Sequence, residues 1–262
     1  MEKTRETAPQ IDLNCDLGES YGPWKMGEDD AVIPFVSSIS IACGFHAGDP
    51  HTMQRTVQRA VKAKVAIGAH PGLPDRVGFG RREMKLAPSE VYADTLYQIG
   101  ALSAFAVASG TWLNHVKPHG ALYHMAERDP LIAEAIVRAV KDYDSTLILV
   151  GFSGGNLLRA AEAERLQTAH EVFADRHYEA NGQLTPRTNE LSVINDPQVA
   201  AAQLLQLLKE GAMPTRQGTW LPLKADTVCL HGDRPHAGAF AAVLRGVLVA
   251  AGWHICSPER VR

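Results

Sequence analysis

Ionisable side chains and glycines occur together at six places in the 262-residue chain, each directly after a short apolar segment. Carboxylates and imidazoles can transfer protons near neutral pH, and a lysine or arginine can hold an anion. Glycine beside such groups lets the backbone approach a ligand closely. We therefore expect the six groups to converge on one pocket. They are DLNCDLGE (12–19), CGFHAGD (43–49), GAHPG (68–72), HVKPHG (115–120), EVFADRH (171–177) and HGDRP (231–235).

The candidates for catalysis come from the first four of these groups. Asp12, Asn14 and Asp16 alternate in the first group and would share one face of an extended strand. A carboxylate buried there needs a hydrogen-bonding partner or a functional role. The histidines that follow later strands could ligate a metal or act as acid or base. Alternatively, each of them could have only a structural role. The candidate catalytic residues are Asp12, Asn14, Asp16, His46, His70, Lys117 and His119.

Lys117 and metal binding each leave alternatives open. Lys117 precedes Pro118, which favours extended backbone and keeps the lysine at a strand end. There it would be an anion clamp or a base with a lowered pKa, or else an exposed surface amine. An aspartate with two or three histidines could hold a divalent ion. No compact motif such as HExxH is present, however, so the sequence leaves the metal unknown.

Two glycine-rich segments could help to shape the pocket. Residues 151–156 (GFSGGN) form a turn whose N–H groups could bind a carboxylate or phosphate, with a plain tight turn as the alternative. No GKS or GKT is present, so this turn is not a Walker loop. Residues 70–82 form a long, basic loop of the kind that serves as a lid or docks a partner.

Short apolar strands alternate with longer helical patterns along the chain. This rhythm predicts an α/β fold with a parallel sheet and helical crossovers in one domain, and it fits a closed barrel and an open sheet equally. The expected strands are residues 10–15, 38–43, 65–69, 113–117, 146–151, 170–173 and 226–230. The expected helices are residues 50–64, 88–109, 130–141, 156–165, 197–210 and 235–251, and 253–256 is expected to be extended.

Composition excludes several classes of function. The chain is 45% hydrophobic and 21% charged, as globular proteins are. Its net charge of −3 argues against nucleic acid or an anionic membrane surface as a partner. No apolar run approaches the roughly 18 residues of a membrane helix, the N-terminus lacks a signal sequence, and the four cysteines form no disulfide or zinc pattern. We therefore expect a cytoplasmic protein.

Longer motifs cover nearly the whole chain from Ile11 onward. They are DLNCDLGESYGPW (12–24), IACGFHAGDP (41–50), AIGAHPGLPDRVGFGRR (66–82), YQIGAL (97–102), HVKPHGALY (115–123), EVFADRHY (171–178) and CLHGDRP (229–235). In this order they resemble the LamB/YcsF family. The resemblance implies an irregular seven-stranded β/α barrel, similar to the glycoside hydrolase/deacetylase superfamily. It would form a single domain over residues 1–262, with 1–9 as a disordered N-terminal extension.

The resemblance also implies an activity. Members of the family carry out the ATP-dependent hydrolysis of the cyclic amide 5-oxo-L-proline to L-glutamate, ADP and phosphate, together with companion subunits B and C. ATP would be a co-substrate that this chain handles with those partners, and a divalent metal stays uncertain. The family motifs add substrate-binding candidates at Glu19, Glu171, Asp175, Arg176, His231 and Asp233.

One segment departs from the family pattern. The family usually has a Gly-Ala pair before an apolar residue and Ile after the sixth strand, whereas this chain has Leu191-Ser192-Val193-Ile194. We expect this departure to change the shape of that loop and the range of substrates. It leaves the histidine and carboxylate groups untouched.

The implied reaction assigns roles to these groups. ATP would phosphorylate the amide oxygen, and water would then attack the carbon with the help of a general base. Asp12 or Asp16 would be the base, and His46 and His70 would polarise groups or move protons.

Lys117 and Arg176 would hold anionic oxygens. We expect replacement of Lys117 by Met to lower turnover about tenfold or more, with little change in thermal stability. Two other functions remain as alternatives: a metal-dependent deacetylase or hydrolase acting alone, and a non-catalytic regulatory binding subunit.

Overall fold

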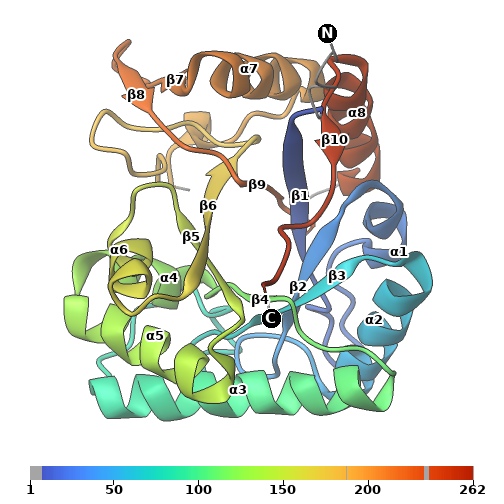
Figure 1. Cartoon of the computed structure of the whole chain (residues 1–262), viewed down its shortest axis with the longest axis vertical. Coiled ribbons are helices and arrows are strands. Elements are labelled where there is room, and N and C mark those ends of the chain that lie inside the picture. Colours follow the sequence, from blue (N-terminus) through green and yellow to red (C-terminus); the bar gives the residue numbers. More distant parts are fainter. Residues whose placement is uncertain (1–7, 187, 233–235, 262) are drawn as a thin grey trace, which may run out of the picture.

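The computed structural model describes residues 8–186, 188–232 and 236–261. Within them, seven parallel strands close into a barrel, in which each strand pairs with the next and β9 pairs back onto β1 (Figure 1). All seven lie where the sequence predicts strands, so the predicted barrel is confirmed. They are β1 (Gln10–Leu17), β2 (Ser38–Ala42), β3 (Ala66–His70), β4 (His115–Val116), β5 (Ile148–Phe152), β6 (Gln167–Phe173) and β9 (Thr227–Leu230).

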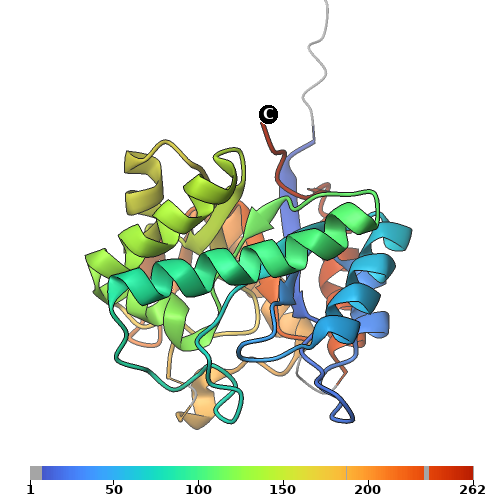
Figure 2. The same ribbon diagram turned by 90° about the horizontal axis from the view of Figure 1, so that it is seen from below.

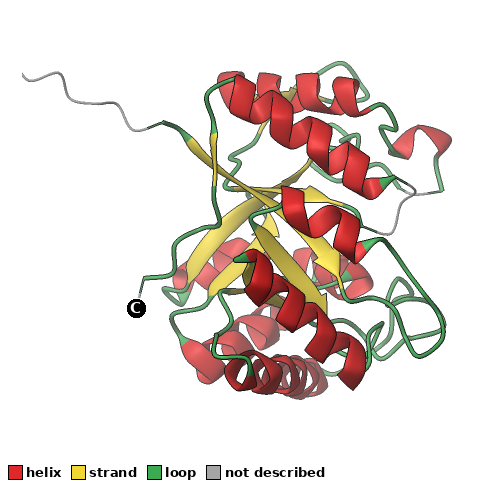
Figure 3. Cartoon of the chain, turned by 90° about the vertical axis from the view of Figure 1, so that its right-hand side faces the viewer, coloured by secondary structure: helices red, strands yellow, loops and turns green. Residues whose placement is uncertain are grey.

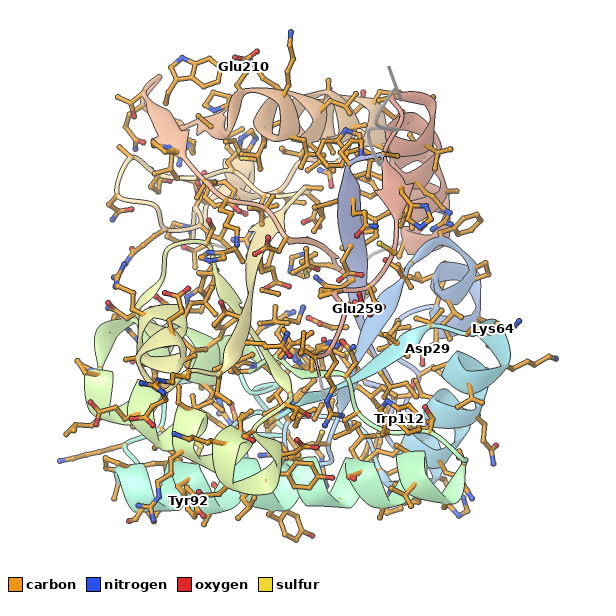
Figure 4. The ribbon with its side chains drawn as sticks, in the orientation of Figure 1. Asp29, Lys64, Tyr92, Trp112, Glu210 and Glu259 are labelled. Carbon is orange, nitrogen blue, oxygen red and sulfur yellow. The ribbon has the colours of Figure 1, made fainter. Side chains whose placement is uncertain are left out.

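Helices surround the barrel and bury the outer face of its strands. The 21-residue α3 runs across the outside of the barrel, as Figure 2 shows, and packs against α5 and β3. The helices are α1 (Asp29–Val32), α2 (Pro50–Ala63), α3 (Pro88–Ala108), α4 (Gly120–Arg128), α5 (Pro130–Asp144), α6 (Asn156–Ala163), α7 (Pro197–Glu210) and α8 (Ala237–Ala250). In Figure 4 the charged side chains of Lys64 and Glu210 lie at the outer edge of the molecule.

Local sequence signals explain where the predicted helices begin. Asp49 precedes Pro50, and its carboxylate accepts the N–H of Thr52 at 2.9 Å, which caps α2. The Asp-Pro pairs that precede α5 and α7 act in the same way. At the other end of α7, Gly211 takes a left-handed conformation (φ 67°), which costs glycine little.

The structure contains elements that the sequence analysis did not predict. Helices α1 and α4 were not predicted; α4 has no side-chain cap, and it ends next to Asp129, which caps α5. The antiparallel pair β7 (Ala212–Pro214) and β8 (Trp220–Pro222) was not predicted either. Strand β4, predicted over residues 113–117, is only two residues long because Pro118 has no N–H with which to extend its ladder.

The ends of the described chain lie side by side. The expected extended piece near the C-terminus is β10 (His254–Ile255), which pairs with the start of β1. The His254 N–H also bonds to the carbonyl of Pro9. Residues 1–7 of the predicted N-terminal extension, and Pro235 at the predicted start of the last helix, lie outside the described residues. None of the helices described here is long and apolar enough to cross a membrane.

Candidate functional site

A cavity of about 720 Å³ opens at the carboxyl ends of the barrel strands. The long loops gather at this end, on the right in Figure 3, opposite β10 and the start of β1. Five of the six polar groups contribute residues to the cavity wall, and His46 of the remaining group packs directly behind it. The predicted convergence on one pocket is therefore confirmed. The predicted site residues in the wall are Asp16, Glu19, His70, Lys117, His119, Glu171, Arg176 and His231.

Lys117 lies at the centre of an ionic network inside the barrel. Its ammonium is 2.7 Å from Asp16 Oδ1, 2.8 Å from Asn14 Oδ1 and 2.9 Å from Glu171 Oε1. Burial alone would lower the pKa of Lys117, but the neighbouring carboxylates raise it well above its usual value. With only 2% of its side chain exposed, Lys117 is not a surface amine. Because all three ammonium protons have acceptors, this geometry does not offer Lys117 as a clamp for a substrate anion.

Asp16 connects this network to the histidines. Its Oδ2 is 3.2 Å from His70 Nε2, and its side chain is 16% exposed, against 6% for Glu19 and none for Glu171. Burial would raise the pKa of Asp16, but His70 and Lys117 outweigh burial and hold it well below its usual range. Asp16 is therefore an ionised carboxylate that a molecule in the cavity can reach.

Glu171 is held by side chains from three other elements. Its Oε1 accepts from Lys117 and from Asn14 Nδ2, at 3.1 Å, and its Oε2 accepts from the hydroxyl of Tyr123, also at 3.1 Å. The sequence analysis did not single out Tyr123. It lies one helical turn after His119 on α4, so recognising that helix would have placed it beside the pocket.

Four buried side chains from successive strand ends form a second cluster. Single ligand atoms of Glu19, His46, His70 and His119 all lie within 4.8 Å of one another, a grouping suited to a metal ion. The rings of His46 and His119 stack in parallel with centroids 3.8 Å apart. Burial, aided by the neighbouring histidines, lowers the pKa of His119 to about 3 and that of His46 well below its usual value.

The glycine-rich loop 70–82 packs against this histidine cluster. Its carbonyl at Phe79 is 2.8 Å from His119 Nε2, and within the loop buried Asp75 pairs with Arg82. A Cβ at Gly72 would come within 2.4 Å of His46 Nδ1, so only glycine leaves room for the imidazole. The loop thus packs against the histidines, and its residues His70 and Arg81 line the cavity.

Asp12 is not brought to the pocket. It lies at the opposite end of the barrel interior, where its carboxylate accepts from the hydroxyls of Ser37, Ser38 and Thr227 at 2.6–2.7 Å. Burial raises the pKa of Asp12 to about 6, against the effect of these hydrogen bonds. Its polar partners give it a structural explanation, so Asp16 is the better placed of the two candidate bases.

Of the remaining predicted residues, His231 and Arg176 line the cavity, and Asp175 contacts His231. His231 Nδ1 is 2.9 Å from Asp175 Oδ2. Arg176 is buried and donates to the backbone carbonyls of Thr185 and Ser192, which ties it to the loop that follows β6. Asp233 lies outside the described residues.

The segment that departs from the family pattern contacts Arg176 and Asp175. Ser192 supplies one of the Arg176 acceptors, and Val193 forms a bridge with Arg176. Ile194 is buried and donates its N–H to Asp175, whereas Leu191 is exposed. The unusual residues therefore support this arginine and this aspartate rather than the inner carboxylates.

The GFSGGN turn is a plain turn whose N–H groups already have partners. Gly155 donates to Phe152, and Gly154 donates to His170 Nδ1. The first N–H groups of α6 are capped by the carboxylate of Glu127, which accepts from Asn156 at 2.6 Å. An internal carboxylate thus occupies the place that a phosphate would take.

Comparison with known proteins identifies the family of this chain and its sequence relatives. The LamB/YcsF family model matches residues 11–262. Relatives named as the A subunit of 5-oxoprolinase occur in Geobacillus thermodenitrificans and Methylococcus capsulatus. The first is 53% identical, covering 92% of this chain and 94% of the relative, and the second is 55% identical, covering 94% of both.

Solved structures agree with these sequence relatives. A lactam utilization protein from Thermus thermophilus superposes with a TM-score of 0.90 at 47% identity, over 95% of this chain and all of that one. A putative cellobiose-phosphate cleavage protein from Enterococcus faecalis V583 shares the fold at 13% identity. Its TM-score is 0.60, over 96% of this chain and 98% of that one.

Proposed function

Because this chain belongs to the LamB/YcsF family, we propose that it acts as the A subunit of a 5-oxoprolinase. In this function it opens the ring of 5-oxo-L-proline to L-glutamate in an ATP-dependent hydrolysis, together with subunits B and C. The observation that carries the proposal is the match, at over 50% identity and almost end to end, to relatives that bear this name. The ionised carboxylate in the cavity supports a hydrolytic role.

The size of the cavity supports the proposal. At about 720 Å³ it lies within the range of small-molecule sites, roughly 300–1,000 Å³, and far exceeds a five-membered lactam. The remaining space could admit a phosphorylated form of the substrate or a segment of a partner protein. Phosphorylation of the amide oxygen by ATP would make the ring carbon electrophilic enough for water to attack.

Asp16 is our candidate for the general base. Water must lose a proton as it attacks, and the ring nitrogen must gain one as it leaves. Asp16 is ionised, reaches the cavity and contacts His70 Nε2 at 3.2 Å, so the two residues can pass a proton between them. Lys117 and Asn14 would hold Asp16 and Glu171 in place rather than bind substrate directly.

The substrate carboxylate requires a cation other than Lys117. Arg81, Arg128 and Arg159 line the outer part of the cavity and have exposed side chains. A carboxylate bound there would leave the lactam ring pointing inward toward Asp16. Arginine suits this task because its planar donors match a carboxylate.

We assign the handling of ATP to the assembled complex. The sequence has no Walker loop, and the N–H groups of the GFSGGN turn are already bonded. We further propose a cytoplasmic location, which the four free cysteine thiols support.

Reconstitution tests this function. The purified chain is mixed with subunits B and C, and glutamate and phosphate release are measured with each protein, ATP or 5-oxoproline left out in turn. We expect both products only in the complete mixture, and their absence from it would refute the proposal. Release of acetate from N-acetylated sugars by this chain alone would support the independent hydrolase instead. Full activity of an Asp16→Asn variant in the complex would support the non-catalytic role.

A further inference from the structure

The proposed ring opening needs an acid as well as a base. The ring nitrogen must gain a proton as it leaves the tetrahedral carbon, because an unprotonated amine is a poor leaving group. Asp16 does not supply this proton, since His70 and Lys117 keep its carboxylate ionised. Another side chain in the wall of the cavity must therefore provide it.

The hydrogens of the inner wall already have acceptors. His70 Nδ1 is 2.7 Å from the carbonyl of Lys117, and His119 Nε2 is 2.8 Å from the carbonyl of Phe79. A carbonyl oxygen only accepts, so each of these nitrogens carries a hydrogen that points into the protein. The hydroxyl of Tyr123 donates to a buried carboxylate, and burial raises the pKa of this tyrosine well above its usual value.

His231 differs because one of its ring nitrogens is open to the cavity. Its Nδ1 lies 3.0 and 2.9 Å from the two carboxylate oxygens of Asp175, to which it donates. The nitrogens of an imidazole point away from each other, and in the described part of the chain Nε2 neither bonds to a protein group nor is enclosed. His231 lines the cavity beside the stacked ring of Phe173, whereas Asp175 is buried behind it.

The backbone brings His231 next to the candidate base. Strands β1 and β9 pair in parallel as far as Cys15 and Leu230, so Asp16 and His231 are the next residues on two neighbouring strands. A Cβ at Gly232 would come within 2.8 Å of the Asp16 carbonyl oxygen, which shows how closely the two strand ends approach. The aspartate and the histidine therefore face the same cavity from adjacent positions.

We propose that His231 is the general acid of the ring opening and that Asp175 is its positioning residue. The carboxylate holds the Nδ1 hydrogen and supplies the negative charge that a doubly protonated imidazole needs, so that Nε2 presents its hydrogen to the cavity. This role rests on the proposed function. It assigns the two proton transfers to separate groups, with Asp16 taking a proton from water and His231 giving one to nitrogen.

The acid acts after ATP has activated the ring, whose nitrogen keeps its own hydrogen. Addition of water leaves an OH on the ring carbon and one proton on Asp16. The bond from this carbon to the ring nitrogen then breaks, and its electron pair goes to the nitrogen, which takes the Nε2 proton of His231 and leaves as a primary amine. The OH loses its proton to solvent and becomes the carbonyl of an acyl phosphate, whose hydrolysis gives glutamate and phosphate.

Loss of the acid should send the tetrahedral intermediate along a different course. Phosphate can leave without a proton from the protein, which restores 5-oxoproline with an oxygen atom from water and hydrolyses ATP without forming glutamate. In the reconstituted mixture, His231→Gln should lower glutamate formation by about 100-fold and raise the ratio of ADP to glutamate from one to more than about ten. In ¹⁸O-labelled water the recovered 5-oxoproline should carry the label.

His170→Gln is the matched control for this experiment. His170 also lies beside a carboxylate, that of Glu162 at 3.6 Å, but it does not line the cavity, so its variant should keep the ratio near one. Added imidazole should restore part of the glutamate formation of His231→Ala, which a packing defect would not allow. A ratio near one in His231→Gln would overturn the proposal. A wild-type mixture that makes no glutamate would instead refute the proposed function.

The same ratio tests Asp175. Asp175→Asn keeps the shape of the side chain but removes its charge, so the ratio of ADP to glutamate should rise at least about threefold. Asp175→Glu returns a carboxylate and should lower the ratio again. An equal loss of ADP and glutamate in Asp175→Asn would show that this residue serves only the fold.

A measurement on the wild-type chain alone covers the case in which the variants do not fold or the proposed function is wrong. Nitrogen-15 NMR of the histidine rings, recorded without ATP, substrate or partners, reports which nitrogen of neutral His231 carries the hydrogen. We expect Nδ1, because Asp175 accepts from it. A hydrogen on Nε2 in the neutral ring would show that Asp175 does not hold the imidazole, and would overturn the proposal.

Discussion

Asp12 and Asp16 lie four residues apart on the same inward face of β1, yet their surroundings move their pKa values in opposite directions. Three hydroxyl groups surround Asp12, and burial raises its pKa to about 6. Asp16 is also largely buried, but Lys117 and His70 hold its pKa well below the usual range. The difference is one of charge, because hydroxyls donate hydrogen bonds without supplying the positive charge that a carboxylate needs.

The two ends of the barrel therefore use the same residue type for different purposes. At the amino end, Asp12 ties β1 to Ser37, Ser38 and Thr227 and closes the interior. At the carboxyl end, Asp16 stays ionised beside a cavity. A buried carboxylate in a barrel strand is thus not sufficient evidence for a catalytic role, and its partners decide which role it has.

The largest effect is expected from Asp16→Asn. The amide cannot accept a proton from water, so turnover in the reconstituted mixture should fall by about 10²–10⁴-fold. Asp12→Asn is the matched control and should retain activity to within about threefold. Glutamate release measures both, and co-purification with the partners checks assembly. Equal losses of turnover in the two variants would mean that Asp12 also takes part in catalysis, and would contradict the different roles assigned to Asp12 and Asp16.

Lys117→Met should reduce both activity and stability. Turnover should fall at least about tenfold, and the free energy of unfolding should fall by about 3–5 kcal/mol because Asp16 and Glu171 would lose their shared cation. The sequence-based expectation of nearly unchanged stability is revised, since Lys117 is fully buried.

Urea unfolding at pH 7 measures the stability of this variant. Lys141→Met is a suitable control because Lys141 pairs with Glu164 on the surface, and it should change little. Unchanged stability of Lys117→Met would mean that the inner carboxylates do not depend on the lysine.

Asp12→Asn should alter the pH dependence of stability. Between about pH 4 and pH 6 folded Asp12 holds a proton that the unfolded chain has released, so the free energy of unfolding falls as pH rises through this window. The shift to about 6 corresponds to a loss of order 3 kcal/mol in the wild type. The variant should lack this component, so the difference between the two unfolding curves should grow from pH 4 to pH 6. A difference independent of pH would contradict the raised pKa.

Ser37→Ala should have the smallest effect. It removes one of three hydroxyl donors to Asp12, which should cost about 1–2 kcal/mol at pH 7, where the carboxylate is ionised. The cost should be lower at pH 4, where Asp12 is protonated, so the same variant supplies its own control. Thermal or urea unfolding at the two pH values measures it. A larger cost at pH 4 would argue against an ionised Asp12 at neutral pH.

Much of the site was predictable because it follows strand ends. His70 and His231 come directly after predicted strands, and Lys117 and Glu171 lie within two others, near the carboxyl ends of parallel strands that meet at one edge of the barrel. Tyr123 was missed because its helix carries no capping signal.

Partners across the barrel were not predictable from local sequence. Lys117 and Asn14 are 103 residues apart, and Asp12 and Thr227 are 215 apart. The roles of Lys117 and Asp12 therefore became clear only when these pairings were known.

The sequence by itself determined the alternation of strands and helices, the family, and the set of ionisable residues that gather at one end of the barrel. These are local properties, set by apolar periodicity, Asp-Pro caps and motifs of contiguous residues. Only the tertiary structure decided which aspartate faces cations, whether Lys117 has a free N–H for a substrate, and which way the histidine nitrogens point. Closure of the barrel creates those contacts between distant residues, and a buried charge takes its pKa from such neighbours.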